Sequence, residues 1–242
     1  MNDVFIGSLL AGLATGVGAI PVLFIKRLTH KWRDILLAFA AGVMMAAALL
    51  SLVPEALDHG TLIHLIIGLV IGAVVLSLLE HFIPHIHVEN LNQSIKIDQK
   101  AMLVIAAITL HNLPEGLATG VSYASGQEGL GEVVAIAIGT QNAPEGFLVA
   151  LFLIHQQINR FIAFIIATLT GLVEVITALL GFYLTNIFEG LVSYGLAFAA
   201  GAMLFIIYKE LIPESHGDGH ERPATHSFII GILLMLTLIN IF

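Results

Sequence analysis

The chain has 242 residues, of which 58% are hydrophobic and 11% are charged, and its mean hydropathy is +0.98. Soluble domains carry about 25% charged residues, so the composition excludes a soluble globular protein and indicates a single polytopic membrane domain over residues 1–242. The formal net charge is −8, and the nine Lys and Arg residues form no patch for nucleic acid. The chain has no cysteine, which excludes disulfides and thiolate metal sites.

Eight apolar segments are candidates for membrane-spanning helices, each of which takes roughly 20 residues. In chain order they are 4–25, 35–57, 61–83, 101–123, 132–155, 161–184, 190–213 and 227–242. The first has no basic region before it, so we expect it to be retained as a helix and not cleaved as a signal peptide. The eighth is short and is expected to end near the far interface. The pattern predicts an all-α polytopic fold.

The basic residues are confined to the odd-numbered connections between these segments. They are Lys26, Arg27, Lys31, Arg33, Lys96, Lys100, Arg160, Lys209 and Arg222, whereas the even-numbered connections carry only acids. The positive-inside rule places the odd connections in the cytoplasm, so both termini are expected to be extracytoplasmic. We therefore predict a multi-pass protein of the cell (inner or plasma) membrane.

Two stretches of the chain resemble one another. Residues 38–57, AFAAGVMMAAALLSLVPEAL, match residues 197–216, AFAAGAMLFIIYKELIPESH, at nine of twenty positions, including the closing Pro-Glu. They belong to the second and seventh segments, which run in opposite directions. Inverted repeats with a site near the bilayer midplane are common in secondary transporters. The alternative is chance similarity between two helices rich in Ala and Gly.

A second repeat lies in the fourth and fifth segments. Residues 111–116, HNLPEG, and residues 141–146, QNAPEG, agree at four of six positions. Helical spacing puts His111, Asn112 and Glu115 on one face, and the second motif repeats the arrangement. The proline of each motif removes a backbone donor and frees a carbonyl in the preceding turn. Ionisable groups at this depth are costly, so the motifs are functional-site candidates.

The sixth segment adds a carboxylate, Glu174, near its middle, and we expect it to share one cavity with Glu115 and Glu145. Three neighbouring carboxylates stay ionised only if cations compensate them, and otherwise take up protons. One imidazole, three carboxylates and several amide oxygens suit divalent ions such as Zn²⁺, Mn²⁺ and Fe²⁺. The alternative, strongest for Asn112 and Asn142, is that these groups only form hydrogen bonds between helices.

HNLPEG followed by QNAPEG within eight hydrophobic segments resembles the ZIP (Zrt/Irt-like) family of metal transporters, and its prokaryotic GufA-type branch in particular. The resemblance includes Glu174, the AFAAGxM stretch and the ELIPE ending of the seventh segment. It implies eight helices in a 3+2+3 bundle, with the first three and the last three related by inversion. It also implies transport of zinc, or of iron, manganese, cobalt or cadmium, into the cytoplasm by alternating access.

The resemblance further implies a metal site with two adjacent positions between the fourth and fifth helices. The first position takes its ligands from both motifs and from a methionine of the second segment, namely His111, Glu115, Gln141, Glu145 and Met44. Met45 competes with Met44 for that role. The second position takes its ligands from Asn112, Asn142 and Glu174, with both motif glutamates bridging. No prosthetic group is implied; the expected partners are divalent metal ions and the bilayer, and a homodimer stays open.

The chain departs from the family pattern at two positions. Many members have His where Gln141 stands, so a strict preference for Zn²⁺ is not expected here. Some GufA-type members have Asp where Asn142 stands, which predicts a weaker second position. An intramembrane metal-dependent hydrolase is the alternative function, but the HExxH motif that combines zinc ligands with a general base is absent, so we do not expect an enzyme.

Further acids and histidines cluster near both membrane surfaces. Histidine-rich stretches can bind metal ions; the alternative is that these are ordinary side chains of solvated loops. One cytoplasmic group is Glu80, His81, His85 and His87. The other is Glu210, Glu214, His216, Asp218, His220 and His226. At the opposite surface Asp58, His59 and His64 are weaker candidates for attracting incoming cations.

Overall fold

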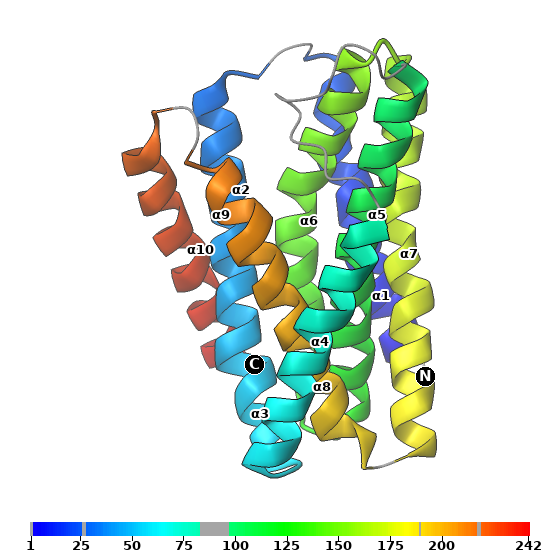
Figure 1. Ribbon diagram of the computed structural model, residues 1–242, viewed down its shortest axis with the longest axis vertical. Coiled ribbons are helices and arrows are strands. Elements are labelled where there is room, and N and C mark those ends of the chain that lie inside the picture. Colours follow the sequence, from blue (N-terminus) through cyan, green and yellow to red (C-terminus); the bar gives the residue numbers. More distant parts are fainter. Residues whose placement is uncertain (1, 26–27, 83–96, 189, 217–218) are drawn as a thin grey trace.

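The computed structural model describes residues 2–25, 28–82, 97–188, 190–216 and 219–242, and over these ranges it contains helices and no strand (Figure 1). In chain order the helices are α1 (Asn2–Ala19), α2 (His30–Ala47), α3 (Val53–Asp58), α4 (Leu62–Phe82), α5 (Ile97–Ala124), α6 (Leu130–His155), α7 (Arg160–Ile187), α8 (Leu191–Ile206), α9 (Ile212–Glu214) and α10 (Glu221–Ile241). A 3-10 turn, Ile20–Leu23, extends α1. Two π-helical segments, Ala48–Leu52 and Ile207–Leu211, join α2 to α3 and α8 to α9.

All eight predicted segments form helices, but the predicted starts of the second, the fourth and the eighth are wrong. α2 begins at His30 and not at 35, α5 begins at Ile97 and not at 101, and α10 begins at Glu221 and not at 227. Each helix therefore starts in a polar stretch before its apolar run. Glu221 lies in the first turn of α10, where a negative charge interacts favourably with the helix dipole. The eighth helix, with 21 residues, is accordingly not short.

The chain is a multi-pass membrane protein by the length and composition of its helices. Seven helical stretches of the described residues are long and apolar enough to cross a bilayer. α5, whose 28 residues include the first polar motif, is not among them. Leu62, Ile66, Val70 and Val74 of α4 are exposed apolar side chains spaced along one helix. Such a surface suits lipid and not water.

The helices run nearly parallel to the long axis of the molecule, and both termini lie toward its lower end (Figure 1). α2 and α8 run in opposite directions. α10 packs against α2, and α4 packs against α8, while α1, α5, α6 and α7 gather on the other side. The connections after α1, α6 and α9 lie at the upper end, and those after α3, α5 and α7 lie at the lower end.

The similar stretches 38–57 and 197–216 have the same backbone irregularity at the same place. The π-helical segments Ala48–Leu52 and Ile207–Leu211 occupy identical positions in the two stretches, and each precedes the Pro-Glu pair. The shift in residue number that relates stretch 38–57 to stretch 197–216 also relates Gly12 of α1 to Gly171 of α7. These two glycines pack backbone against backbone, because a Cβ on either would collide with the carbonyl of the other.

Candidate metal site

Both motifs lie within continuous helices, the first in α5 and the second in α6, and the helices continue through Pro114 and Pro144. Asn112 donates from Nδ2 to the carbonyl oxygen of Thr170 in α7, at 2.7 Å. Asn142 donates from Nδ2 to the carbonyl oxygen of Ala11 in α1, at 3.0 Å. The shift in residue number that relates stretch 38–57 to stretch 197–216 also relates Ala11 to Thr170, so these two residues occupy equivalent positions. The two asparagines thus attach α5 and α6 to equivalent places on α7 and α1.

The glycine that closes each motif allows an equally close approach. A Cβ on Gly116 would collide with the backbone of Glu174 in α7, and a Cβ on Gly146 would collide with the backbone of Thr15 in α1. Thr15 and Glu174 are again equivalent positions by the same shift in residue number. Because α7 has a carboxylate where α1 has a hydroxyl, these close contacts bring one additional acid, Glu174, to the motifs.

Two side-chain hydrogen bonds connect the motifs with each other and with α7. Gln141 donates from Nε2 to Oε1 of Glu115 at 2.6 Å. Asn142 donates from Nδ2 to Oε1 of Glu174 at 2.7 Å. All four side chains are buried, whereas Glu145 is partly exposed. The structure therefore brings together Glu115, Gln141, Asn142 and Glu174 as the sequence predicted.

Three buried oxygens at this place have no hydrogen-bond partner within the described part of the chain. They are Oε2 of Glu115, Oε1 of Gln141 and Oε2 of Glu174, one from each of α5, α6 and α7. The Glu115 carboxylate also experiences the charges of both Glu145 and Glu174. Buried polar atoms normally have partners, so unpaired oxygens in an acidic cluster indicate a place for a cation.

His111 has an unexpected neighbour. Its Nδ1 donates to the carbonyl oxygen of Ala107 at 2.7 Å, and its Nε2 lies 2.9 Å from Oε2 of Glu210 in the π-helical segment after α8. From its place in the sequence Glu210 was expected among the surface acids near the cytoplasm, and its contact with the central motif was not predicted. His111 also interacts electrostatically with Glu145. The imidazole therefore lies between the motif pair and α8.

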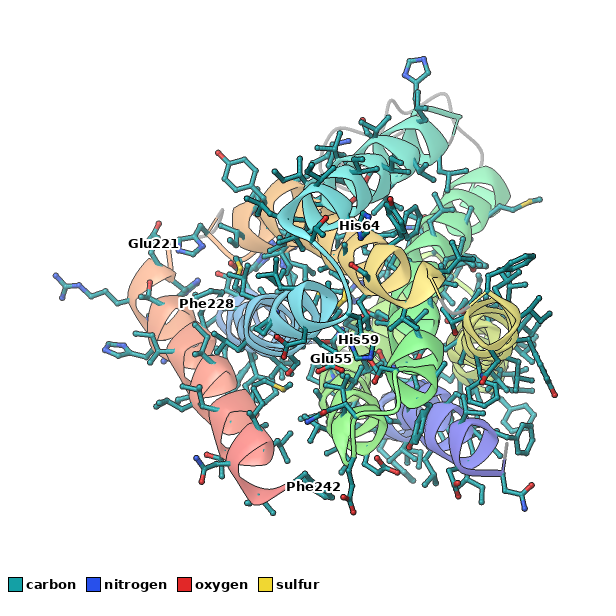
Figure 2. All side chains as sticks on the ribbon, turned by 90° about the horizontal axis from the view of Figure 1, so that it is seen from below. Glu55, His59, His64, Glu221, Phe228 and Phe242 are labelled. Atoms are coloured by element: carbon teal, nitrogen blue, oxygen red, sulfur yellow. The ribbon has the colours of Figure 1, made fainter. Side chains whose placement is uncertain are left out.

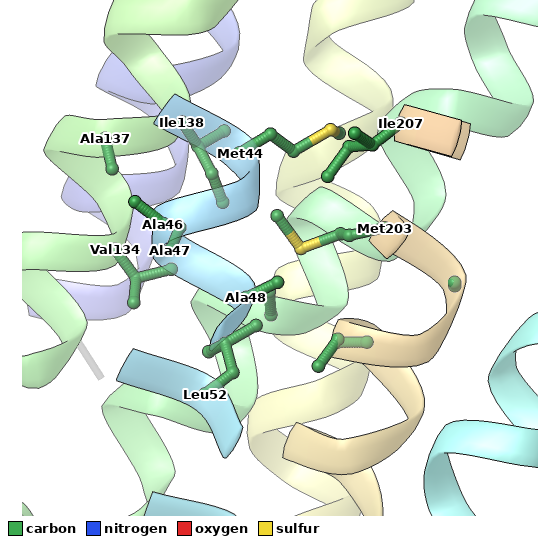
Figure 3. Packing of buried hydrophobic residues seen from close by; sticks show 14 of the residues in the cluster. Met44, Ala46, Ala47, Ala48, Leu52, Val134, Ala137, Ile138, Met203 and Ile207 are labelled. Atoms are coloured by element: carbon green, nitrogen blue, oxygen red, sulfur yellow. The ribbon is translucent and has the colours of Figure 1, made fainter. Parts of the chain in front are cut away.

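Met44 is fully buried in an apolar cluster with Met203 and Ile207, and its side chain extends toward Ile207 (Figure 3). Met45 is partly buried and packs against the same cluster. Both methionines thus belong to the packing between α2 and α8, and the role of Met44 as a ligand stays a prediction.

The other predicted groups near the upper surface lie partly outside the described residues, which exclude His85, His87 and Asp218. Within the residues that are described, Glu80 of α4 forms an ion pair with Lys209, next to Glu210. His220 Nδ1 lies 3.2 Å from Oδ2 of the buried Asp34. No three His, Asp or Glu side chains of the described ranges converge in a group that would by itself hold a metal ion. Any ion in the central site would therefore also use amide oxygens.

The family model described as ZIP Zinc transporter matches residues 87–239. The chain is 38% identical to the zinc transporter GufA of Myxococcus xanthus, with 98% of each chain covered. It is 35% identical to the zinc transporter ZIPB of Bordetella bronchiseptica, over 93% of this chain and 76% of that protein. It is 32% identical to the zinc transporter ZupT of Chlorobaculum parvum, over 97% and 96% of the two chains.

Proposed function

This chain belongs to the ZIP zinc transporter family, and from that premise we propose that it carries divalent metal, zinc foremost, across the membrane into the cytoplasm. Iron, manganese, cobalt and cadmium are further candidate cargoes. The family is one of transporters, so the chain is not an enzyme. No contact among the described residues favours the hydrolase alternative, since the buried carboxylates are held by amide groups. A homodimer stays a prediction.

The observation that carries the proposal is the set of unpaired oxygens on Glu115, Gln141 and Glu174. Each residue uses its other polar atom for a hydrogen bond inside the site, which fixes the direction of the unpaired one. Carboxylate and amide oxygens bind divalent cations, and a cation would also offset the repulsion among the three acids. The cargo ion would therefore bind among these three helices.

Two adjacent ion positions account for the ligand set. The first uses both motifs, through His111, Glu115, Gln141 and Glu145, and Met44 if its thioether turns from the apolar cluster. The second uses the asparagines and the acid of α7, namely Asn112, Asn142 and Glu174, with Glu115 and Glu145 bridging. Asn112 and Asn142 use their amide nitrogens for α7 and α1, which leaves the amide oxygens as the atoms that can bind an ion.

The tautomer of His111 suits it to bind the ion. The backbone carbonyl of Ala107 can only accept, so Nδ1 of the imidazole carries the proton. Nε2 is then the atom directed at Glu210, and a divalent cation between them would replace the proton that they share in its absence. With a single imidazole in the set, we expect a broad preference among Zn²⁺, Mn²⁺, Fe²⁺, Co²⁺ and Cd²⁺.

Alternating access is supported by the difference between the two ends of the site. Toward the lower end an apolar layer of Ala48, Leu52, Val134 and Ile138 packs between α2 and α6 (Figure 3). Toward the upper end the side chains of His111 and Glu210 remain 12% and 25% exposed. The site is thus closer to solvent at the upper end, the end of the basic connections, which the positive-inside rule assigns to the cytoplasm.

The proposed architecture is the 3+2+3 bundle with inverted repeats. It is supported by the paired π-helical segments and by the equivalent contacts of Asn112 and Asn142. In this architecture α5 and α6 carry the ion between two inverted sets of three helices. Both termini lie on the extracytoplasmic side.

Uptake of ⁶⁵Zn²⁺ into proteoliposomes tests the transport function. Wild type should accumulate the metal, and the combined substitution Glu115→Ala with Glu145→Ala should abolish accumulation because two bridging carboxylates are lost. Glu221→Ala removes an exposed acid at the start of α10, away from the site, and serves as the control (Figure 2). Equal uptake by wild type and by the double variant would exclude the proposed site.

A further inference from the structure

A second polar cavity opens at the lower end of the bundle, apart from the central site. Its volume is about 280 Å³, and its polar lining comes from the π-helical segment Ala48–Leu52, from α3 and from the connection before α6. These polar residues are Ser51, Glu55, Gln127 and Glu128. Seen from below, Glu55 lies beside His59 near the middle of the lower face (Figure 2).

One buried hydroxyl at this cavity has no hydrogen-bond partner within the described residues. It is Oγ of Ser51, a residue that is only 6% exposed. A buried polar atom without a partner is energetically costly unless water or an ion completes it. Ser51 lines the cavity together with Glu55, a residue that is 7% exposed, so the completing group would lie there.

The wall that carries Glu55 is fixed in place. His59 lies 3.2 Å from a carboxylate oxygen of Glu55 through Nδ1, and its Nε2 lies 2.8 Å from the carbonyl oxygen of Ser125. This imidazole connects α3 to the connection that leads into α6. Glu55 thus lines the cavity together with Glu128, an exposed acid of that connection.

The charge of this end favours cations. The connections after α3, α5 and α7 contain no Lys or Arg in the sequence, whereas Asp58 and Glu128 lie in or next to them. A concave surface lined by one sign of charge concentrates counter-ions above their bulk level. The cavity would therefore hold cations before they meet the central site.

The apolar layer keeps this cavity distinct from the central site. Ala48 lies between Met44 and Ser51 along the chain and Leu52 comes directly after Ser51, and both pack with Val134 and Ile138 of α6 in one buried cluster (Figure 3). α6 runs upward from the cavity at Leu130 and Val133, through this layer, to Gln141. An ion in the lower cavity thus cannot contact the motif ligands without movement of the layer.

We propose that Ser51, Glu55 and Glu128 form a separate site for a hydrated divalent cation at the lower mouth of the transporter. The proposal rests on the transport function proposed above, since it gives the incoming cargo its first binding place. Two carboxylates, one hydroxyl and the amide of Gln127 supply few direct ligands, so water completes the shell and binding is weak. Weak binding suits a place from which the ion must move on.

Mn²⁺ binding tests the lower site in a variant whose central site is disabled. The full chain in lipid nanodiscs carries Glu115→Gln with Glu145→Gln, and the electron paramagnetic resonance signal of free Mn²⁺ reports binding. The lower site should still bind Mn²⁺ in this background. Adding Glu55→Gln or Glu128→Gln should weaken that binding about tenfold, because each removes one of two carboxylates. Ser51→Ala should weaken it less.

The matched control is Glu132→Gln, which removes an acid at the same end of the molecule. Glu132 lines a different cavity, between α1 and α6, and should leave Mn²⁺ binding unchanged. Melting temperatures without metal show whether each variant is folded; Glu128, being exposed, can be changed with little effect on folding. Unchanged Mn²⁺ binding after Glu128→Gln and Glu55→Gln, or no Mn²⁺ binding in the disabled background, would overturn the proposal.

Measurements of Zn²⁺ uptake distinguish a failure of the lower site from a failure of the transport function. In otherwise wild-type protein, Glu128→Gln should raise the Zn²⁺ concentration needed for half-maximal uptake and leave the maximal rate unchanged. If wild type transports no metal while Mn²⁺ binding still depends on Glu55, then the transport proposal fails and the lower cation site stands. Equal half-maximal concentrations for wild type and Glu128→Gln would contradict its role as the first binding place.

Discussion

Three buried side chains of the central site, those of Glu115, Gln141 and Glu174, each use one polar atom in a hydrogen bond and leave another without a partner within the described residues. Gln141 gives its amide nitrogen to Glu115, and Glu174 accepts from Asn142 with one of its two oxygens. A buried polar group without a partner costs about 1–3 kcal/mol. A bound divalent cation would remove that cost, so metal should stabilise the folded protein.

His111 and Gln141 occupy equivalent positions in the two motifs, and a substitution at Gln141 can change the metal preference. Gln141→His would supply a second imidazole, a better ligand for Zn²⁺ than an amide oxygen. We expect the preference for Zn²⁺ over Mn²⁺ in competitive uptake to rise about tenfold. Gln156→His, at the upper end of α6, is the control. A competition series among Zn²⁺, Cd²⁺, Mn²⁺ and Fe²⁺ that is identical to that of wild type would refute this role.

Spacing along the helix was sufficient to predict that the two motifs face each other. The three- and four-residue spacing of the motifs placed Glu115 and Gln141 at the interface of α5 and α6, and Glu174 was expected because it is an isolated acid in an apolar helix. The contact between His111 and Glu210 was not predictable in this way. It depends on a π-helical segment, which adds a residue to the turn and changes where Glu210 is directed.

At the scale of the helices, the two π-helical segments place unlike residues at equivalent positions. Ser51 in the first corresponds to Glu210 in the second, and the two lie toward opposite ends of the bundle. Glu210 contacts the central histidine, whereas Ser51 lines the lower cavity. The repeat was visible in the sequence, but the shared irregularity was not, because the residues of Ala48–Leu52 and Ile207–Leu211 differ at four of five positions.

The ion pair between Glu80 and Lys209 joins α4 to α8 beside this second segment, and Lys209 also lies 5.2 Å from the ring centre of Phe205. Glu80→Gln and Lys209→Gln should each lower the melting temperature in detergent by a few degrees, because each breaks this ion pair. The double variant should lose less than the sum, with a coupling of about 1 kcal/mol, since Lys209 is partly exposed. Strictly additive losses would show that the pair contributes nothing.

Helix boundaries were the least predictable part of the elements. The apolar runs located all eight helices, but α2, α5 and α10 begin earlier than those runs, within polar stretches. Hydropathy reports where lipid surrounds a helix, and the backbone hydrogen bonds of a helix continue into the interface beyond it. A prediction from the length of apolar runs therefore misses the polar first turn of a helix.

For the whole molecule, the orientation in the membrane is the prediction that most needs a test, and the absence of cysteine makes the test simple. Gln127→Cys places one thiol in the lower connection between α5 and α6, and His155→Cys places one at the upper end of α6; both side chains are exposed. In intact cells a membrane-impermeant thiol reagent should label Gln127→Cys and should label His155→Cys only after permeabilisation. The reverse pattern would invert the proposed direction of transport.

If the unpaired oxygens of α5, α6 and α7 bind the transported metal, anomalous diffraction at the zinc edge will locate the ion among them. Crystals of the Zn²⁺-loaded protein should show an anomalous peak between α5 and α6, with oxygen or nitrogen ligands from Glu115 and Glu145 at about 2.0–2.2 Å. A second peak toward Glu174 would fill the adjacent position. Full occupancy of zinc elsewhere, with no peak beside Glu115 and Glu145, would contradict the account.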